Sequence, residues 1–220
     1  MKALRPSSCL LGLALLAFAA TPGFAEDRPA EPPPQPLPKP QLDAKIAYCK
    51  TCHGLSGQGF RGAYVMPRLA GQQPQYLEEQ LRAFIERRRL HPLMQNVAHA
   101  LNPATLGAIA AHFKDLNPQS IGGGAKDLVA AGKKIYDEGV PDKQIPACAS
   151  CHGADAKGDG AMPRLAGQLH EYTTRTLADW SKARGQDPAK PDASATMAPI
   201  AQGLTHEQAA AVAAYLGSLE

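Results

Sequence analysis

The chain has 220 residues, of which 44% are hydrophobic but only 5% aromatic, and it contains 20 glycines, 20 prolines and five cysteines. The formal net charge of +3 is small, and no run of Lys and Arg is long enough to indicate nucleic-acid binding. Glycine has no three-residue period, which excludes a collagen-like repeat. Because aromatic side chains normally fill much of a core, the composition predicts cores built on Leu and Ala, or cores filled by a group that is not an amino acid.

The first 25 residues follow the pattern of a secretory signal peptide. Basic residues precede an apolar stretch over residues 9–20, and the small residue Ala25 marks the expected cleavage site. The apolar stretch is too short for an uncleaved anchor, since crossing a membrane takes about 20 residues. We therefore expect residues 1–25 to be removed on export, and Cys9 with them.

Segments rich in Pro and Gly divide the remaining chain into two parts. Residues 26–41 include seven prolines and are expected to form an extended, semi-rigid arm. Residues 118–124 contain three glycines and are expected to link the two halves. The expected domains are therefore residues 42–117 and residues 125–220.

The four cysteines that remain after export lie in two copies of the motif C-x-x-C-H. The copies are Cys49, Cys52 and His53, and Cys148, Cys151 and His152. Two thiols at this spacing can add to the vinyl groups of a porphyrin, and the histidine that follows can ligate its iron, so the motif is typical of c-type haem attachment. The pattern predicts two covalently bound haem c groups, with His53 and His152 as iron ligands.

Three other uses of these cysteines compete with haem attachment. Paired C-x-x-C groups can form a zinc site, but the gap of roughly 95 residues is wider than usual ligand spacings. A thioredoxin-like redox pair would need a βαβ context, and no strand pattern surrounds either motif. Two disulfides are the usual expectation for four cysteines in an exported chain, but bridges within C-x-x-C are strained and uncommon.

A second repeated motif extends the duplication beyond the cysteines. The sequence MPRLAGQ occupies residues 66–72 and recurs unchanged at residues 162–168, and Tyr76 and Tyr172 follow it at the same spacing. A period of roughly 100 residues is too long for a solenoid repeat and indicates a tandem domain duplication. Neither copy contains the alternating polarity of a β-strand, so we expect two all-α domains.

Each copy is expected to end in an amphipathic helix. Asn102 and Pro103 form an N-cap and a first-turn proline in the first copy, and Thr205 with Gln208 forms a capping box in the second. Apolar residues then recur at helical spacing, namely Leu106, Ile109, Ala110 and Phe113 in the first copy and Ala209, Val212, Ala213 and Leu216 in the second.

The sixth coordination position of each iron needs a second ligand. Met94 and Met197 occupy equivalent places in an expected loop before the last helix of each copy, and a thioether opposite an imidazole is the ligation that raises haem potentials. The methionine that opens each MPRLAGQ motif lies beside a proline close to the histidine and is expected to pack against the ring. His91 and His99 are alternatives at the first haem, but the second copy has no equivalent histidine. We therefore expect Met94 and Met197 to be the ligands.

Two further pairs of residues are placed to support the haems. The carbonyl oxygens of Pro67 and Pro163 are expected to accept a hydrogen bond from Nδ1 of the ligating imidazoles, which would fix their tautomer and direction. Arg68 and Arg164 are candidates for pairing with haem propionates, because a buried carboxylate needs a charged donor. Simple exposure in a loop is the alternative for both arginines.

With these motifs the chain resembles the di-haem class I cytochromes c, and most closely the cytochrome c4 family. The resemblance covers about residues 42–220 and rests on the paired C-x-x-C-H, P-x-L-A-G-Q and Met-x-x-(hydrophobic)-Ala-x-x-Leu motifs. It implies two tandem cytochrome c domains, each wrapped around one covalently bound haem. It also implies a periplasmic one-electron carrier between respiratory-chain or periplasmic redox partners.

The resemblance implies redox partners such as a terminal oxidase, a cytochrome bc1 complex or a periplasmic dehydrogenase, and it allows peripheral association with a membrane. Two protein ligands on each iron leave no open site for a substrate, which favours a carrier over an enzyme. The alternative function is the haem subunit of a periplasmic oxidoreductase that acts on sulfur compounds or with a flavin or quinoprotein dehydrogenase.

Helix packing is expected to differ between the two copies. The second copy carries Gly132 and Tyr136 on its opening helix and Tyr215 on its last helix, which is the pairing that the family brings together. The first copy has only residues 42–48 before its cysteines, which predicts a shorter opening helix, and His112 stands where the second copy has Tyr215. We therefore expect different packing in the first domain and unequal midpoint potentials for the two haems.

Overall fold

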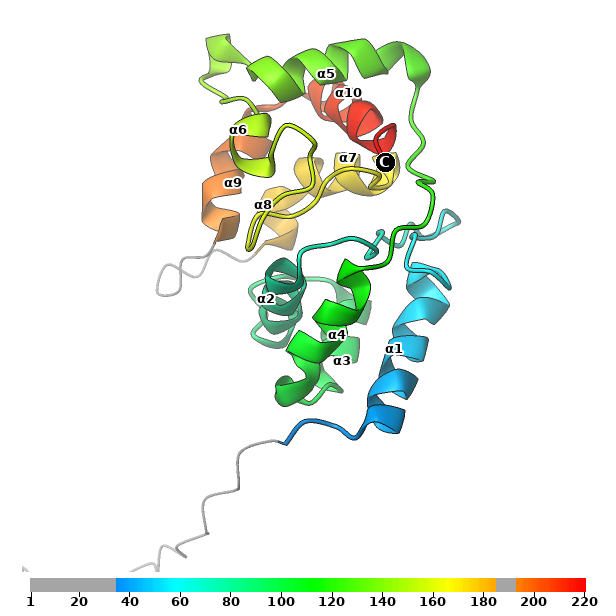
Figure 1. The fold of residues 1–220 in the computed structure, drawn as a ribbon. Helices are drawn as coiled ribbons and strands as arrows, with labels where there is room; N and C mark the ends of the chain where they lie inside the picture. Colours follow the sequence, from blue (N-terminus) through cyan, green and yellow to red (C-terminus); the bar gives the residue numbers. More distant parts are fainter. Residues whose placement is uncertain (1–34, 185–192) are drawn as a thin grey trace, which may run out of the picture. The chain divides into compact units, whose positions relative to one another are not determined.

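The structure, a computed structural model, describes residues 35–184 and 193–220. The expected signal peptide and most of the expected proline arm lie outside these residues. The described residues form helices joined by loops, with isolated bridges but no β-strand among them. The all-α prediction is therefore confirmed (Figure 1).

The helices follow the duplication. In the first copy they are α1 (Lys39–His53), α2 (Pro74–Ile85), α3 (Pro92–His99) and α4 (Leu106–Lys114), with the 3₁₀ helix η1 (Pro103–Thr105) leading into α4. In the second copy they are η2 (Lys126–Leu128), α5 (Val129–Glu138), η3 (Pro141–Lys143), α6 (Ala149–His152), α7 (His170–Ala178), α8 (Trp180–Ala183), α9 (Ala193–Gly203) and α10 (His206–Gly217). In the first copy α2 packs on α4, and in the second α5 and α7 pack on α10.

The opening helix of the first copy is longer than its sequence predicts. Helix α1 begins at Lys39, inside the expected proline arm, and continues through the cysteine motif. Neither Gly nor Pro interrupts residues 41–53, and Gly54, with a φ of +86°, ends the helix. In the second copy Gly139, with a φ of +74°, ends α5 before the motif is reached. The motif therefore ends a long helix in one copy and occupies the short helix α6 in the other.

Each copy has its own apolar core. In the first copy the buried core residues are Ile46, Leu77, Leu101, Leu106, Ile109, Ala110 and Phe113, and in the second they are Tyr136, Ala156, Ala166, Val212, Tyr215 and Leu216. The apolar positions expected on α4 and α10 are all buried, which confirms the predicted faces of the two last helices.

The 3₁₀ helix η1, which leads into α4, and helix α10 are capped by the residues that the sequence predicts. The Asn102 side chain accepts a hydrogen bond from the backbone N–H of Ala104 at 2.9 Å. In the second copy Thr205 Oγ1 accepts from the backbone N–H of Gln208 at 3.2 Å, and Gln208 Oε1 accepts from that of Thr205 at 2.9 Å. These bonds satisfy donors that have no partner within a helix.

The opening and closing helices of the second copy meet at Gly132. A Cβ atom at this position would lie 1.9 Å from the carbonyl oxygen of Ala211 on α10, so the two backbones are in direct contact. One turn away, the rings of Tyr136 and Tyr215 pack with their centroids 5.5 Å apart. The expected glycine and aromatic pairing is therefore present in the second copy.

The first copy packs its last helix differently. His112 on α4 lies edge-on against its neighbour Phe113, with ring centroids 5.3 Å apart. The Nε2 atom of His112 is buried and has no hydrogen-bond partner within the described ranges. This aromatic contact is made within one helix instead of between two, which agrees with the different packing expected for this domain.

Replacing Gly132 by alanine is expected to destabilise the second domain. The new methyl group would overlap the Ala211 carbonyl, and overpacking of a rigid contact costs about 1–3 kcal/mol or more. Guanidinium titration of the holoprotein would measure this loss in the free energy of unfolding. The matched control is Gly107→Ala on α4, whose Cβ would meet only the flexible carboxylate of Glu78 at 3.1 Å, and the same loss in both variants would contradict the prediction.

In the part of the chain that the structure describes, no helix has both the length and the apolar character needed to span a bilayer.

Candidate functional site

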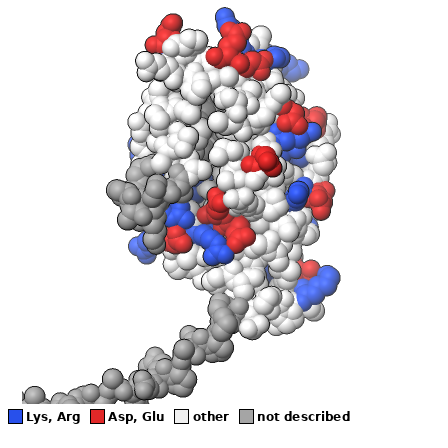
Figure 2. All heavy atoms as spheres, turned by 60° about the vertical axis from the view of Figure 1, so that its left-hand side comes forward, with Lys and Arg blue, Asp and Glu red and all other residues white. Residues whose placement is uncertain are grey.

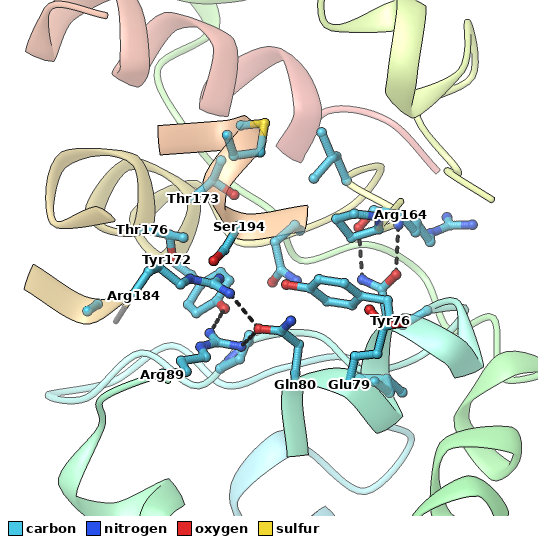
Figure 3. A pocket seen from close by; sticks show the side chains of 18 of the residues that line it. Tyr76, Glu79, Gln80, Arg89, Arg164, Tyr172, Thr173, Thr176, Arg184 and Ser194 are labelled. Carbon is cyan, nitrogen blue, oxygen red and sulfur yellow. Dashed lines mark hydrogen bonds between the residues drawn. The ribbon is translucent and has the colours of Figure 1, made fainter. Parts of the chain in front are cut away.

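One cavity of about 820 Å³ is lined by residues of both copies, and Figure 3 shows part of it. The residues that the sequence predicts at the haem sites all line it: Cys49, Cys52, His53, Pro67, Arg68, Met94, Cys148, Cys151, His152, Pro163, Arg164 and Met197. The alternative ligands Met66, Met162 and His91 also line it. The fold therefore brings two motifs that are far apart in the sequence to one common space.

The four cysteines are free thiols at the edges of this cavity. Cys49 and Cys148 are half-buried, whereas Cys52 and Cys151 are exposed. Burial raises the pKa of Cys49 and raises the pKa of Cys148 to about 11. Among the described residues no group of three or more His, Cys, Asp and Glu side chains is arranged to hold a metal ion. These observations support neither the disulfide nor the zinc interpretation.

The two histidines of the motifs are buried, and their backbone-facing nitrogens have partners. His53 Nδ1 donates to the carbonyl oxygen of Pro67 at 2.8 Å, and His152 Nδ1 donates to that of Pro163 at 3.0 Å. Burial lowers the pKa of both imidazoles, although these hydrogen bonds act in the opposite direction. The expected bonds are present in both copies. They leave Nε2 of each neutral ring as the atom able to ligate iron.

A glycine in each copy lets the start of the MPRLAGQ segment, which carries the proline, pack close to the loop after the histidine. Gly59 and Gly158 stand six residues after His53 and His152, and the N–H of each donates to the carbonyl of its histidine, at 2.8 and 2.9 Å. A Cβ on Gly59 would lie 2.9 Å from the carbonyl oxygen of Met66, and one on Gly158 would lie 2.2 Å from that of the equivalent Met162. Both glycines also have positive φ angles. The equal spacing after the histidine is the signal by which the sequence could have indicated them.

Met94 and Met197 lie on helices, not in the loops that the sequence predicts. Met94 is in the first turn of α3, which Pro92 opens, and Nδ1 of His91 accepts a hydrogen bond from the Met94 N–H at 3.3 Å. Met197 is in α9, which continues through Pro199. Pro92 is compatible with the first turn of α3, whereas Pro199 lies inside α9 and does not end it. Both sulfur-bearing side chains are half-buried and line the cavity.

The alternative histidine ligands have other local roles. His91 caps α3, as its hydrogen bond to the backbone shows. His99 Nδ1 donates to the carbonyl oxygen of Gln95 at 3.0 Å within the same helix. Because Nδ1 of His91 accepts a hydrogen bond, the neutral ring carries its proton on Nε2. His99 does not line the cavity. The structure therefore favours neither histidine as the second ligand.

The guanidinium groups of Arg68 and Arg164 are buried in different surroundings. Arg68 donates to the carbonyl oxygens of Ala70 at 3.0 Å and Pro118 at 2.9 Å, which ties the interdomain segment to the first copy. Arg164 Nε donates to the carbonyl oxygen of Ala166 at 3.1 Å, but its Nη2 atom is buried without a partner within the described residues. A carboxylate from a bound group would satisfy this atom.

The last residue of each MPRLAGQ motif joins the two copies, a role that was not predicted. Gln72 Oε1 accepts from the backbone N–H of Arg164 at 2.7 Å, and its Nε2 donates to the Arg164 carbonyl at 2.9 Å. Gln168 makes the same pair of bonds with the backbone of Arg68, at 2.9 and 3.1 Å. All four residues are buried. We call these reciprocal bonds the glutamine clamp. The sequence signal was the exact repetition of this glutamine in both copies.

Comparison with known proteins places both halves of the chain in one family. The family described as "Cytochrome c" matches residues 27–119 and again residues 129–220. The cytochrome c-552 of Acidithiobacillus ferridurans is 38% identical over 176 residues, which are 78% of this chain and 73% of that protein. A protein of Thiomonas intermedia named "Thiosulfate dehydrogenase electron acceptor" is 35% identical over 178 residues, or 79% of each chain.

A solved structure shows the same arrangement of helices. The cytochrome c4 of Acidithiobacillus ferrooxidans superposes with a TM-score of 0.67 and 38% sequence identity, covering 78% of this chain and 98% of that chain. Coverage of nearly the whole of that chain means that both copies are matched, and not one domain alone.

Proposed function

Because the chain belongs to the cytochrome c4 family of di-haem cytochromes c, we propose that it is a periplasmic carrier that passes single electrons between redox proteins. The observation that carries this proposal is the common cavity, which is lined by two C-x-x-C-H motifs and by a methionine from each copy. Its two covalently bound haem c groups account for the aromatic-poor composition, because they occupy the space that large side chains would otherwise fill.

The residues around the cavity fit two haems. The free thiols supply the attachment points, and the buried Arg164 Nη2 without a partner fits a propionate. When bound, each haem supplies an iron that gains or loses one electron. His53 and His152 are held by proline carbonyls in the tautomer that ligates through Nε2. Apolar walls that include Leu77, Leu101 and Phe113 exclude water, which limits solvent reorganisation during electron transfer.

We propose Met94 and Met197 as the second iron ligands, and Arg68 and Arg164 as partners of haem propionates. Lining of the same cavity as the histidines supports both methionines. For the arginines the support is unequal, since Arg164 has a free donor atom whereas Arg68 already donates to Ala70 and Pro118. Ligation of each iron on both sides leaves no site for a substrate, which is the property of a carrier.

The carrier function predicts a distinct optical response to loss of each methionine. In Met94→Leu and Met197→Leu, we expect the weak methionine–iron band at the red edge of the oxidised spectrum to fall by about half, with high-spin features and carbon monoxide binding at the altered haem. The matched controls are Met66→Leu and Met162→Leu, which line the same cavity and should keep the full band. Loss of the band in the control variants instead would assign ligation to the MPRLAGQ motifs. A wild-type protein that binds carbon monoxide readily would favour an enzyme.

The partners of the carrier are proposed from its relatives and its surface. Terminal oxidases, cytochrome bc1 complexes and periplasmic dehydrogenases are the candidate classes of partner. The signal-peptide pattern of residues 1–25 supports a periplasmic location. On the face shown in Figure 2, basic and acidic side chains are interspersed with wide uncharged areas. Without residues 1–25, which contain Lys2 and Arg5, the net charge is 21 − 20 = +1. This small charge and the surface arrangement favour docking through short-range contacts over long-range electrostatic steering.

A dehydrogenase of reduced sulfur compounds is the most specific candidate for the electron donor. The observation that favours it is the Thiomonas relative, whose name gives it the role of accepting electrons from thiosulfate dehydrogenase. Stopped-flow mixing of the oxidised holoprotein with such an enzyme and thiosulfate should reduce both haems. Reduction by a quinol-oxidising complex alone would assign the donor to the respiratory chain.

A further inference from the structure

Two arginines, one from each copy, meet inside the cavity. Arg89 follows α2 and Arg184 follows α8, and the two residues form an isolated antiparallel bridge. The N–H of Leu90 donates to the carbonyl oxygen of Ala183 at 2.7 Å, which holds the two backbones together. Both arginines line the cavity, and Figure 3 shows their side chains lying toward Gln80 and Tyr172.

Both guanidinium groups donate to the same neutral oxygen atom. Arg89 Nη1 donates to Gln80 Oε1 at 2.8 Å, and Arg184 Nη1 donates to that oxygen as well. Arg89 Nη2 also donates to the hydroxyl of Tyr172 at 2.7 Å. Two cations that converge on one amide oxygen repel each other, and a neutral acceptor does not compensate their charge.

Aromatic rings hold each guanidinium from its other side. Arg89 lies over the ring of Phe84 at 4.6 Å from its centroid, and Arg184 lies over the ring of Trp180 at 4.5 Å. Phe84 and Trp180 are equivalent positions of the two copies, so the pair is built from matching elements of both domains. These cation–π contacts hold the two guanidinium groups, and therefore their positive charge, inside the cavity.

The charge of this pair has no counter-ion among the described residues. Arg61 and Arg82, by contrast, each pair with a glutamate. Arg184 is only 5% exposed, so water does little to stabilise its charge. Burial alone would raise the pKa of Tyr172, yet the charges of Arg89 and Arg184 lower it below its usual value. The site therefore has a positive potential that an anion would neutralise.

The surrounding elements do not supply that anion. The titratable and charged side chains that line the cavity around the pair are Tyr76 and Glu79 on α2, Arg88 and His91 before α3, Tyr172 and Arg175 on α7, and Asp179 before α8. Of the two carboxylates in this set, Glu79 accepts a hydrogen bond from Gln75 at 3.0 Å and Asp179 pairs with Lys182 at 2.9 Å. Arg88 pairs with Glu86. The set includes a further cation in Arg175, which adds to the positive potential.

We infer that Arg89 and Arg184 form a shared carboxylate site that holds haem propionates from both domains. A propionate is an anion that a c-type haem brings into this cavity, and guanidinium groups bind carboxylates through paired hydrogen bonds. The site is separate from Arg68 and Arg164, whose Nε atoms donate to backbone carbonyls of their own motifs, and it adds to the propionate contact proposed for Arg164 Nη2. This inference rests on the di-haem carrier function proposed above.

A shared site has a consequence for both haems. Fixed positive charge beside a haem favours the ferrous state over the ferric state, which carries one more positive charge. Because each copy contributes one arginine to the same Gln80 oxygen, loss of either arginine should alter the environment of both haems. Anchors that served one domain each would alter one haem only.

The test is a redox titration of the holoproteins Arg89→Gln and Arg184→Gln. We expect both midpoint potentials to fall in each single variant and to become dependent on pH between about pH 5 and 8, because a propionate without its cation protonates more readily. Arg→Lys at either position should recover part of the shift, since the charge is kept. Arg82→Gln is the control, an exposed arginine on α2 that pairs with Glu78, and its potentials should match the wild type.

Wild-type potentials in both Gln variants, at full haem content, would overturn the inference. If these variants lose haem, redox-difference infrared spectra of the wild type with ¹³C-labelled propionates decide the question. Propionates paired with arginine should give carboxylate bands down to about pH 5, and protonated bands in that range would count against the site. Haem content by pyridine haemochrome separates the two claims, because a wild-type protein without two haems would instead contradict the proposed function.

Discussion

Replacing all four motif cysteines by alanine is expected to leave the chain largely unfolded. The cavity that the haems would fill has a volume of about 820 Å³, and at about 24 cal/mol per Å³ an empty cavity of this size would cost about 20 kcal/mol. Entry of water reduces this figure, but half of it still matches the whole stability of a typical domain, about 5–15 kcal/mol. Far-UV circular dichroism and limited proteolysis of the apoprotein would measure the loss.

Domain-specific variants make this expectation sharper. Cys49→Ala with Cys52→Ala should unfold the first domain and leave the second haem attached, and Cys148→Ala with Cys151→Ala should do the reverse. Thr51→Ala and Ser150→Ala are the controls. Each changes one of the two residues between the cysteines of a motif, at an exposed position. Both variants should retain both haems. A cysteine-free chain with native helix content and protease resistance would show that the protein core does not depend on haem.

The features that were predicted correctly depend on residues close together in the chain. Asn102 and Thr205 cap helices within three residues of themselves, and the stripes on α4 and α10 follow from helical spacing alone. The proline carbonyls were also predicted, because the MPRLAGQ motif follows the histidine in both copies, although the proline comes 14 residues after His53 and 11 after His152. Local chemistry and duplication together were sufficient for these assignments.

The features that were missed join residues that lie far apart in the chain. The sequence shows Gln72 and Gln168 only as part of a repeated motif. It does not indicate that their side-chain amides bind the backbone of Arg164 and Arg68 in the other copy. The meeting of Arg89 with Arg184 depends on how two domains dock, which no spacing within one copy determines. The helices at Met94 and Met197 were missed although they are local: loops were expected there from the sequence, whereas Pro92 opens α3 and α9 continues through Pro199.

The glutamine clamp explains why the two copies should behave as one cooperative unit. Each amide side chain satisfies a backbone N–H and a backbone carbonyl of the other copy, and all of these groups are buried. Each glutamine makes two hydrogen bonds to the backbone of one residue in the other copy. Because both bonds need good geometry at once, they fix the position and the orientation of one copy relative to the other. The clamp is therefore a positioning element between the two haem sites.

Replacing Gln72 and Gln168 by leucine is expected to uncouple the two domains. Each substitution leaves two buried backbone groups without a partner, at about 1–3 kcal/mol for each group, so each single variant should lose about 2–6 kcal/mol. The double variant should unfold in two steps, with Trp180 emission reporting the second domain and haem absorbance reporting both. Gln75→Leu is the matched control, because its amide bonds only to Glu79 on the same helix. It should keep a single transition.

The same variants connect the clamp to electron transfer. Loss of alignment between the copies should slow exchange of electrons between the two haems by a large factor, while each haem keeps its low-spin spectrum, because neither glutamine is an expected iron ligand. Pulse radiolysis of the half-reduced holoprotein would measure that rate in Gln72→Leu, Gln168→Leu and the control. A wild-type rate and one unfolding transition in the double variant would show that other contacts hold the domains together. A slowed rate with intact spectra would show that a repeated glutamine sets the distance over which the electron moves.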